Sequence, residues 1–253
     1  MGLYPNILFH FTSKNGLYSI LEGTFKISCA RETIKGQTSK REFAVPMVSF
    51  CDLRLSELKE HVEKYGKFGI GLTKKWAFAN GLNPVMYISE TNNFTDNFIQ
   101  SLDGIYSLIN KIVDPNDTVD LSKDYMNLLN IYRFLKNYQG ELKRHNQTIS
   151  NYRFADEREW RYVPPISEKL NYRPFVPITR IKTKAEKAKY NKDVEHIRLR
   201  FKPDDINYLI VEGEKDINIL INHLRRVKNK FSLKTIERLS SRILTLDQIK
   251  NDI

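Results

Sequence analysis

Two short polar patches interrupt strand-like runs of the sequence. The first extends from His10 to Thr12, and the second from Asp156 to Arg161. An extended backbone through the second patch places Glu157, Glu159 and Arg161 on one face of a strand. Two carboxylates on one face can hold a sugar hydroxyl and stabilise positive charge that develops at an anomeric carbon. Together with nearby arginines, which bind pyrophosphate well, the patches predict a site that handles a nucleotide.

Both patches also have a purely structural interpretation. His10 and Thr12 can form a hydrogen-bonded core pair that caps a neighbouring strand or helix. The charged residues of the second patch can form the solvated, cross-strand-paired face of an edge strand, with Trp160 and Tyr162 packed inside. The residue types alone leave these alternatives open.

Short strands and helices must position the two patches. The run from Ile7 to Thr12 is typical of a strand, and a helix is expected to follow up to Gly23. The polar stretch from Arg31 to Arg41 predicts a mobile loop near the site, in which either arginine can bind phosphate. A strand from Val45 to Asp52 comes next. Gly69 and Gly71 leave one face of a further strand bare, as when a ring or a ligand lies close.

The pattern changes to helical periods between about residues 93 and 147. One apolar run extends from Phe94 to Ile112 and a second from Tyr125 to Leu135, with a turn at Asp114-Pro115 between them. This segment predicts a helical hairpin inserted between sheet-forming blocks. We therefore expect a single compact α+β domain over residues 1–253, with a mixed or antiparallel sheet and a helical insertion at 93–147.

The composition limits the class of protein. A chain of 253 residues with 41% hydrophobic residues can bury a sizeable core. It has no apolar run long enough for a membrane span and no signal-peptide pattern at the start, so no membrane partner is expected. The two cysteines, Cys29 and Cys51, fit reduced thiols in a cytoplasmic protein. Histidines and cysteines lack the spacing of a metal site, and no metal is predicted.

The net charge of +11 is concentrated in the second half of the chain. Residues 1–140 carry +2 and residues 141–253 carry +9, with the densest basic stretch of loop and helix at 169–202. Nucleic acid or an acidic partner protein can bind such a surface, although a solvated helix face has the same composition. No helix-turn-helix or zinc-finger signature accompanies the charge, so sequence-specific DNA recognition is not indicated.

Several segments, in this order and spacing, resemble the AbiGi family of abortive phage-resistance proteins. They are Phe9–Thr12, Ile20–Gly23, Val48–Leu53, Tyr65–Leu72 and Asp156–Pro164. The resemblance covers most of the chain outside the helical segment and the basic stretch. It implies a role in bacterial antiviral defence. AbiGi-like proteins are described as antitoxins of a pair whose toxin is a nucleotidyltransferase-like protein, which implies such a toxin as partner.

A more distant resemblance is to ADP-ribosyltransferase-like proteins of the DarT type. Its basis is a histidine on the first strand, a helix ending in Ile20-Leu21-Glu22-Gly23, and a late glutamate. It implies an ADP-ribosyltransferase-like fold with NAD as substrate. The roles it implies are ribose or nicotinamide contact by His10 and Thr12, pyrophosphate binding by Arg31 or Arg41, oxocarbenium stabilisation by Glu159 and acceptor positioning by Glu157, with Ser49 and Arg161 as further contacts to NAD.

The sequence departs from a complete transferase pattern. No single arginine is assignable to the pyrophosphate, and no acceptor-recognition loop is identifiable. Two alternatives therefore stay open. The protein is an NAD-dependent ADP-ribosyltransferase or NAD glycohydrolase, or it is a non-catalytic antitoxin that binds and restrains a toxin partner.

Overall fold

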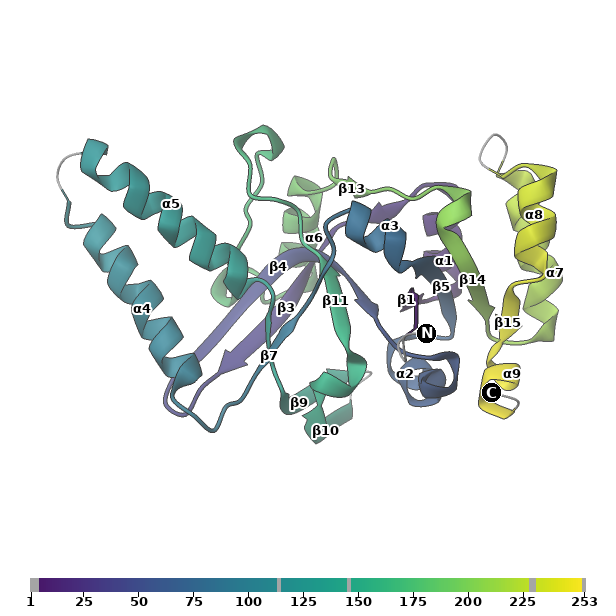
Figure 1. Cartoon of the computed structure of the whole chain (residues 1–253), viewed down its shortest axis with the longest axis horizontal. Helices are drawn as coiled ribbons and strands as arrows, with labels where there is room; N and C mark the ends of the chain where they lie inside the picture. Colours follow the sequence, from purple (N-terminus) through teal and green to yellow (C-terminus); the bar gives the residue numbers. More distant parts are fainter. Residues whose placement is uncertain (1–4, 113–114, 145–146, 228–230, 252–253) are drawn as a thin grey trace.

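The computed structural model describes residues 5–112, 115–144, 147–227 and 231–251. Its centre is a mixed sheet of nine strands among these residues (Figure 1). Seven of them form one path in the order β15-β14-β5-β1-β4-β11-β6. Their bounds are β1 (Ile7–Thr12), β4 (Lys40–Cys51), β5 (Phe68–Thr73), β6 (Asn83–Pro84), β11 (Glu159–Tyr162), β14 (Ile206–Val211) and β15 (Ile243–Thr245).

β4 is long enough to pair with different strands along its two halves. Its last residues pair with β1 and β11, and its first residues pair with β3 (Ser28–Lys35) and β12 (Val176–Pro177). All of these ladders are antiparallel, whereas β14 and β15 pair in parallel. The whole is a mixed α+β fold, as the sequence predicts.

Alternation along β1 builds two apolar layers, one on each side of the sheet. Leu8 packs into a layer with Phe50 and Trp160, and Phe9 packs into the opposite layer with Cys51. Four helices cover the first layer: α1 (Lys14–Glu22), α3 (Lys74–Ala79), α7 (Glu214–Arg226) and α8 (Leu233–Ser240). Two helices cover the second layer: α2 (Leu58–Tyr65) and α9 (Leu246–Asn251).

The face of β5 on which Gly69 and Gly71 carry no side chain is covered by aromatic rings of the protein itself. A Cβ at Gly69 would lie 2.9 Å from the Phe11 ring, and a Cβ at Gly71 would lie 2.7 Å from the Phe9 ring. Both phenylalanines are on β1, which pairs with β5. The glycines therefore make room for a neighbouring strand's aromatic side chains, and the ligand that their spacing indicated is not needed to explain them.

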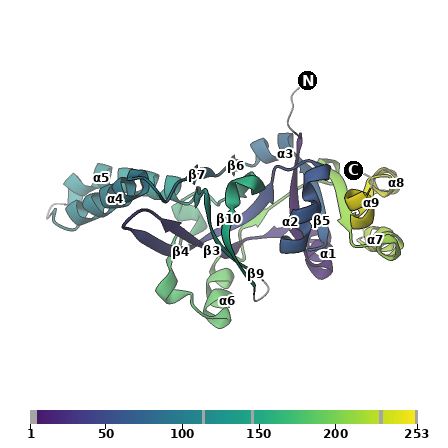
Figure 2. The same ribbon diagram turned by 90° about the horizontal axis from the view of Figure 1, so that it is seen from below.

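The segment 93–147, for which a helical hairpin was expected, is helical over only part of its length. α4 (Phe94–Ile109) and α5 (Pro115–Tyr132) pack together at one end of the molecule, and α7, α8 and α9 lie at the other end (Figure 2). The expected helical pattern ends at Tyr132, because strands follow. These are β8 (Leu135–Asn137), which pairs with β7 (Met86–Ile88), and the antiparallel pair β9 (Gln139–Arg144) and β10 (Gln147–Arg153). Of the expected turn, Asp114 lies outside the described residues and Pro115 begins α5.

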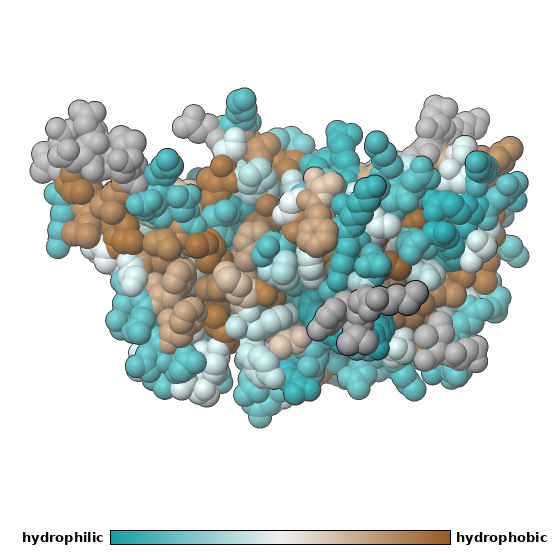
Figure 3. Space-filling view, viewed as in Figure 1, coloured by the Kyte–Doolittle hydropathy of each residue, from teal (hydrophilic) through white to brown (hydrophobic). Residues whose placement is uncertain are grey.

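A third apolar cluster lies between these helices and the start of β4. Ile99 and Leu102 of α4 pack with Phe43 and Val45 of β4 and with Tyr132. The outer side of the two helices keeps apolar side chains in solvent, including Tyr106, Leu108 and Ile131. Figure 3 shows this hydrophobic area at the left of the molecule, over α4 and α5.

The basic stretch 169–202 consists of short pieces around one helix, α6 (Lys184–Asp193). Leu199, in β13 (Arg198–Leu199), pairs with β2 (Phe25–Lys26). Short 3₁₀ helices occupy Leu55–Glu57, Phe154–Glu157, Glu168–Leu170, Ile178–Arg180 and Pro203–Asp205. No helix within the described residues is both long enough and apolar enough to cross a membrane.

Candidate ligand site

The second polar patch is not extended throughout. Glu157 ends a 3₁₀ helix, Arg158 turns the chain with a left-handed backbone (φ 43°), and the strand begins only at Glu159. The single face that an extended backbone would give to Glu157, Glu159 and Arg161 therefore does not exist as expected. The two carboxylates are nevertheless brought together, because Lys136 of β8 contacts both.

The charged side chains of this patch are buried. Glu157 and Glu159 are each 5% exposed and Arg161 is fully buried. β11 lies between β4 and β6, and Trp160 packs into the apolar layer on the opposite face. A solvated face of an edge strand, the structural alternative for these residues, is therefore wrong. Charges buried to this degree require partners, because desolvation penalises each of them.

Glu159 receives four hydrogen-bond donors. Its Oε1 accepts from Ser49 Oγ at 2.8 Å and from Arg161 Nε at 2.7 Å, while its Oε2 accepts from Lys136 Nζ at 2.6 Å and from Arg161 Nη2 at 3.2 Å. Burial opposes ionisation of this carboxyl, but Arg161 and Lys136 outweigh it and hold its pKa well below the ordinary range. Glu159 is therefore a carboxylate at physiological pH.

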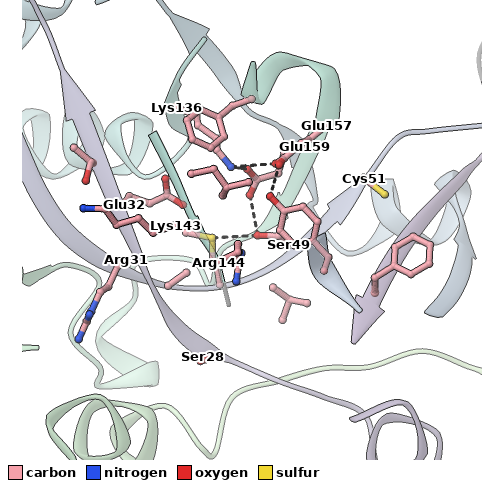
Figure 4. A pocket seen from close by; sticks show the side chains of 18 of the residues that line it. Ser28, Arg31, Glu32, Ser49, Cys51, Lys136, Lys143, Arg144, Glu157 and Glu159 are labelled. Atoms are coloured by element: carbon pink, nitrogen blue, oxygen red, sulfur yellow. Dashed lines mark hydrogen bonds and ion pairs between the residues drawn. The ribbon is translucent and has the colours of Figure 1, made fainter. Parts of the chain in front are cut away.

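Lys136 is the functional residue that the sequence did not reveal. Its Nζ lies 2.6 Å from Glu159 Oε2 and 3.3 Å from Glu157 Oε2 (Figure 4). Burial favours the neutral amine, but the adjacent carboxylates raise the pKa of Lys136 above its usual value. Glu157 also accepts a short hydrogen bond from the Tyr65 hydroxyl. No sequence signal pointed to Lys136, because the residues before it follow a helical period.

Two further contacts fix the ends of this network. Arg161 Nη2 lies 2.9 Å from Glu32 Oε1, and Arg161 Nη1 donates to the Arg133 carbonyl at 3.0 Å. The backbone N–H of Glu159 donates to the Tyr87 hydroxyl at 2.8 Å. Burial raises the pKa of Tyr87 to about 12, so its hydroxyl stays protonated. The network thus holds three carboxylates, those of Glu32, Glu157 and Glu159, with only two cations.

His10 lies on the opposite face of the sheet from Glu159. Phe9 and Glu159 both face Cys51 across β4, so they share a face, and His10 follows Phe9 on the strand. The His10 ring packs against Phe50 and lies within hydrogen-bond distance, 2.8 Å, of the Ser49 carbonyl. Burial lowers its pKa. The ring is therefore neutral, and because a carbonyl only accepts, Nδ1 carries the proton and Nε2 the lone pair.

Ser49 joins the two faces. Its carbonyl binds His10, and its hydroxyl donates to Glu159. Thr12, by contrast, lies at the end of β1, where its carbonyl abuts Gly66. The structure thus brings Ser49, Glu157, Glu159 and Arg161 together, places His10 on the other side of Ser49, and leaves Thr12 outside the cavity wall.

The stretch from Arg31 to Arg41 is a β-hairpin, and the expected mobile loop is wrong. β3 and β4 pair from Ser28 opposite Met47 to Lys35 opposite Lys40, because alternate apolar residues of both strands pack into the third cluster. Arg31 lines the cavity, and its Nη2 donates to the Ile181 carbonyl at 2.6 Å. Arg41 forms an ion pair with Asp103 and is not part of the cavity wall.

A cavity of about 1470 Å³ surrounds this network. His10, Ser49, Glu157 and Glu159 line it, as do side chains of the hairpin β9–β10 and of α6. Its volume exceeds that of an ordinary small-molecule pocket. Figure 4 shows the carboxylates and Lys136 on one wall, with Arg31 and Arg144 elsewhere around the same space.

The site carries no metal-binding constellation. Within the described residues there is no group of three or more histidine, cysteine, aspartate or glutamate side chains that could hold a metal ion. The chemistry available to the cavity is that of the ionised Glu159 beside the carboxyl group of Glu157, a neutral imidazole and a set of cations.

The comparisons with known proteins identify the family. The family model that matches residues 24–212 is described as "Putative abortive phage resistance protein AbiGi, antitoxin". The chain belongs to the AbiGi family. This AbiGi chain is also similar to "Abortive phage resistance protein AbiGi" of Lactococcus lactis subsp. cremoris, with 29% identity over 236 residues that cover 86% of this chain and 92% of that protein. No solved structure gives a significant match.

Family membership supports a role in abortive infection, the antiviral defence expected from the sequence resemblance. The matched residues 24–212 include every strand and side chain of the carboxylate network, from Glu32 to Arg161. Most of the cavity wall therefore lies in the matched part of the chain, whereas His10 and the other lining residues of β1 and α1 precede it. An ADP-ribosyltransferase-like fold remains a prediction.

Proposed function

We propose that this AbiGi protein binds NAD in its large cavity during abortive infection. The observation that carries the proposal is the distribution of charge around one cavity. Two buried carboxylates, those of Glu157 and Glu159, and the half-buried Glu32 share two cations on one wall, while further arginines and lysines line the remainder. NAD has the matching chemistry, because it carries a cationic nicotinamide ring and an anionic pyrophosphate.

The carboxylate wall suits the reaction of an ADP-ribosyltransferase or an NAD glycohydrolase. Breaking the bond between nicotinamide and ribose develops positive charge at the ribosyl carbon, and an ionised Glu159 nearby would stabilise it. Glu157 is the residue to orient the acceptor. In the structure both oxygens of Glu159 are occupied by donors. Catalysis therefore requires the ribose hydroxyls to displace Ser49 or Lys136 from this carboxylate.

The first test is calorimetric titration of the purified protein with NAD. We expect micromolar binding that weakens at least tenfold in Glu159→Gln, about 1.4 kcal/mol. Glu237→Gln, an exposed change on α8, is the matched control. Ser49→Ala perturbs the same carboxylate without unpairing a charge, so it tests the site even if Glu159→Gln proves unstable. Absence of heat up to millimolar NAD would contradict the proposal.

A phage-challenge assay then separates catalysis from binding alone. An enzyme loses defence in Glu159→Gln and also in His10→Ala, and NAD consumption stops in both. Full defence by these two variants, with folding verified by thermal melting, would exclude a catalytic role.

A second candidate function is a non-catalytic antitoxin that restrains a nucleotidyltransferase-like toxin. Two observations favour it: the description of the family includes the word antitoxin, and exposed lysines lie on α6 and just before it. An acidic toxin surface would bind there. Reversing Lys182, Lys189 and Lys192 to glutamate should weaken such a complex and reduce its salt dependence. An unchanged affinity for a nucleotidyltransferase-like toxin would count against this candidate.

A further inference from the structure

One group of cations on the cavity wall has no carboxylate partner among the described residues. Several basic side chains around the cavity are paired: Lys35 with Glu90, Lys40 with Glu42, and Lys143 with Glu141. Five others line the same space without an ion pair among the described residues: Lys26, Arg31, Arg144, Lys184 and Lys187. Lys26 lies on β2, and the other four lie on β3, β9 and α6.

These four side chains come from elements that face one another across the cavity. Arg31 lies on β3, and α6 packs on this strand, where the Cys29 N–H donates to Asn191 Oδ1 at 2.8 Å. Lys187 is on the same helix. Arg144, at the end of β9, lies with its guanidinium 4.7 Å from the centre of the Tyr65 ring. Figure 4 shows Arg31 and Arg144 on separate ribbons around one space.

Mutual repulsion marks the cluster as one electrostatic unit. Burial lowers the pKa of Lys187, and the charges of Arg31 and Arg144 lower it further. Arg31 is also held in place, because its Nη2 donates to the carbonyls of Ile181 and Lys182. Arg31, Arg144 and Lys184 are exposed and Lys187 is half-buried, so an anion from solvent can reach all four of these like charges.

The start of α6 adds to the positive potential. Thr183 caps the helix through a capping box with Glu186, and both Thr183 and Lys184 line the cavity. The positive end of the helix dipole therefore points to the same region as the four cations. In contrast, the carboxylate wall near Tyr65 begins with Glu157, which accepts the Tyr65 hydroxyl.

We propose that Arg31, Arg144, Lys184 and Lys187 form a subsite for the diphosphate of a nucleotide. This inference deepens the proposed function, on which it rests, by placing the anionic part of the ligand. The Tyr65 ring contacts Arg144 of the subsite, and its hydroxyl donates to Glu157, so the ribosyl end of a nucleotide whose diphosphate lies here would extend past Tyr65 toward the carboxylates. A nucleic-acid strand fits less well, because its successive phosphates would meet that carboxylate wall.

Calorimetry with three probes tests the subsite: NAD, inorganic pyrophosphate, and nicotinamide riboside, which lacks the diphosphate. We expect Arg144→Gln and Lys187→Met each to weaken NAD and pyrophosphate at least tenfold, with little effect on the riboside. Lys189→Met is the matched control, because it removes an exposed lysine of the same helix outside the cavity. Arg144 is itself exposed, so Arg144→Gln keeps the fold intact.

The outcomes separate the subsite from the function on which it rests. If NAD binds and both variants bind it as tightly as the parent, the subsite is wrong and the proposed function stands. If pyrophosphate binds and is lost in both variants while NAD does not bind, the subsite stands and the NAD proposal fails. No binding of either probe overturns both. Tight binding of a single-stranded oligonucleotide that weakens equally in Lys189→Met overturns the subsite in favour of a nucleic-acid surface.

Discussion

Glu159 is ionised because two cations, Lys136 and Arg161, lie beside it in the interior. The ionised state of Glu159 depends most on Lys136. Lys136 contacts both Glu157 and Glu159, whereas Arg161 is shared with Glu32. Removal of one partner from a buried network leaves an uncompensated charge in a medium of low polarity. The site is therefore also a point where stability is vulnerable.

We predict that Lys136→Met lowers the free energy of unfolding by about 3–5 kcal/mol, because two buried carboxylates lose their shared cation. Lys143→Met is the control, since Lys143 is exposed and paired only with Glu141, and it should change stability by less than about 0.5 kcal/mol. Denaturant unfolding measures both variants. Equal stabilities would mean that the network contributes no more than a surface ion pair.

The stability of the protein should also fall with acidification, and His61 gives a defined part of that fall. Burial lowers the pKa of His61 from 6.5 to about 4, so the unfolded chain takes up a proton between these values and the native state does not. Stability is therefore lost as the pH falls from about 6.5 to about 4, by up to about 3 kcal/mol. The lowered pKa of His10 acts in the same direction.

Replacement of His61 tests this assignment. The His61 ring stacks on Tyr65 with centroids 4.4 Å apart, and His61→Phe keeps a ring there. Unfolding measured at several pH values should show a shallower slope between pH 6.5 and 4 for this variant than for the parent. A parent-like slope in His61→Phe would show that other groups titrate in this range.

At the scale of the elements, the close approach of β1 and β5 depends on glycine. Gly71→Ala places a methyl group against the Phe9 ring, and we expect it to cost about 1–3 kcal/mol through overpacking. Gly104→Ala is the matched change on α4, where an added Cβ meets nothing within 4 Å. It should stabilise the protein by up to about 1 kcal/mol, because alanine favours a helix. Thermal melting of the two variants should therefore shift in opposite directions.

Local patterns predicted those strands and helices whose apolar residues keep one spacing, that of a strand or that of a helix, along the whole element. The run from Ile7 to Thr12 is β1, and the helix expected after it is α1, which ends at Glu22 before Gly23. The pattern failed at β8, where a strand directly follows the helical period of α5, because its pairing with β7 is a contact between distant segments. The hairpin of β3 and β4 was missed because its polar outer residues have the composition of a loop.

In the candidate site, too, local patterns identified some residues, whereas contacts between distant segments determine the rest. Glu157, Glu159 and Arg161 were found from residue type and spacing, and Ser49 was implied only by the resemblance to ADP-ribosyltransferase-like proteins. The structure places all four in one network. The position of His10 relative to Glu159 depends on the register of β1 and β11 against β4, which no local pattern contains. Lys136 could not be found for a similar reason, since its partners are more than twenty residues away in sequence.

At the scale of the whole molecule, a ligand in the cavity should stabilise the entire fold. The cavity is lined by elements that include β1, β4, β9 and α6, so a bound nucleotide would contact several separate elements at once. At a concentration of 100 Kd, NAD should add about 2.7 kcal/mol to the free energy of unfolding. For a chain of this size we expect a rise in Tm of about 5–10 °C.

Differential scanning fluorimetry measures this shift directly. Arg144→Gln should show a smaller rise at the same NAD concentration, because its affinity is lower. Nicotinamide alone serves as a control for weak binding of the ring. An identical melting temperature with and without millimolar NAD would contradict a cavity that binds NAD.

The position of β5 in the sheet also has a consequence for biosynthesis. β5 lies between β1 and β14, and β14 is more than a hundred residues further along the chain. At ordinary rates of translation, β14 leaves the ribosome on the order of ten seconds after β5. During that interval β5 presents an open hydrogen-bonding edge beside an apolar layer, which is the kind of surface that chaperones bind. The nascent chain is thus most exposed to aggregation in the interval before β14 emerges.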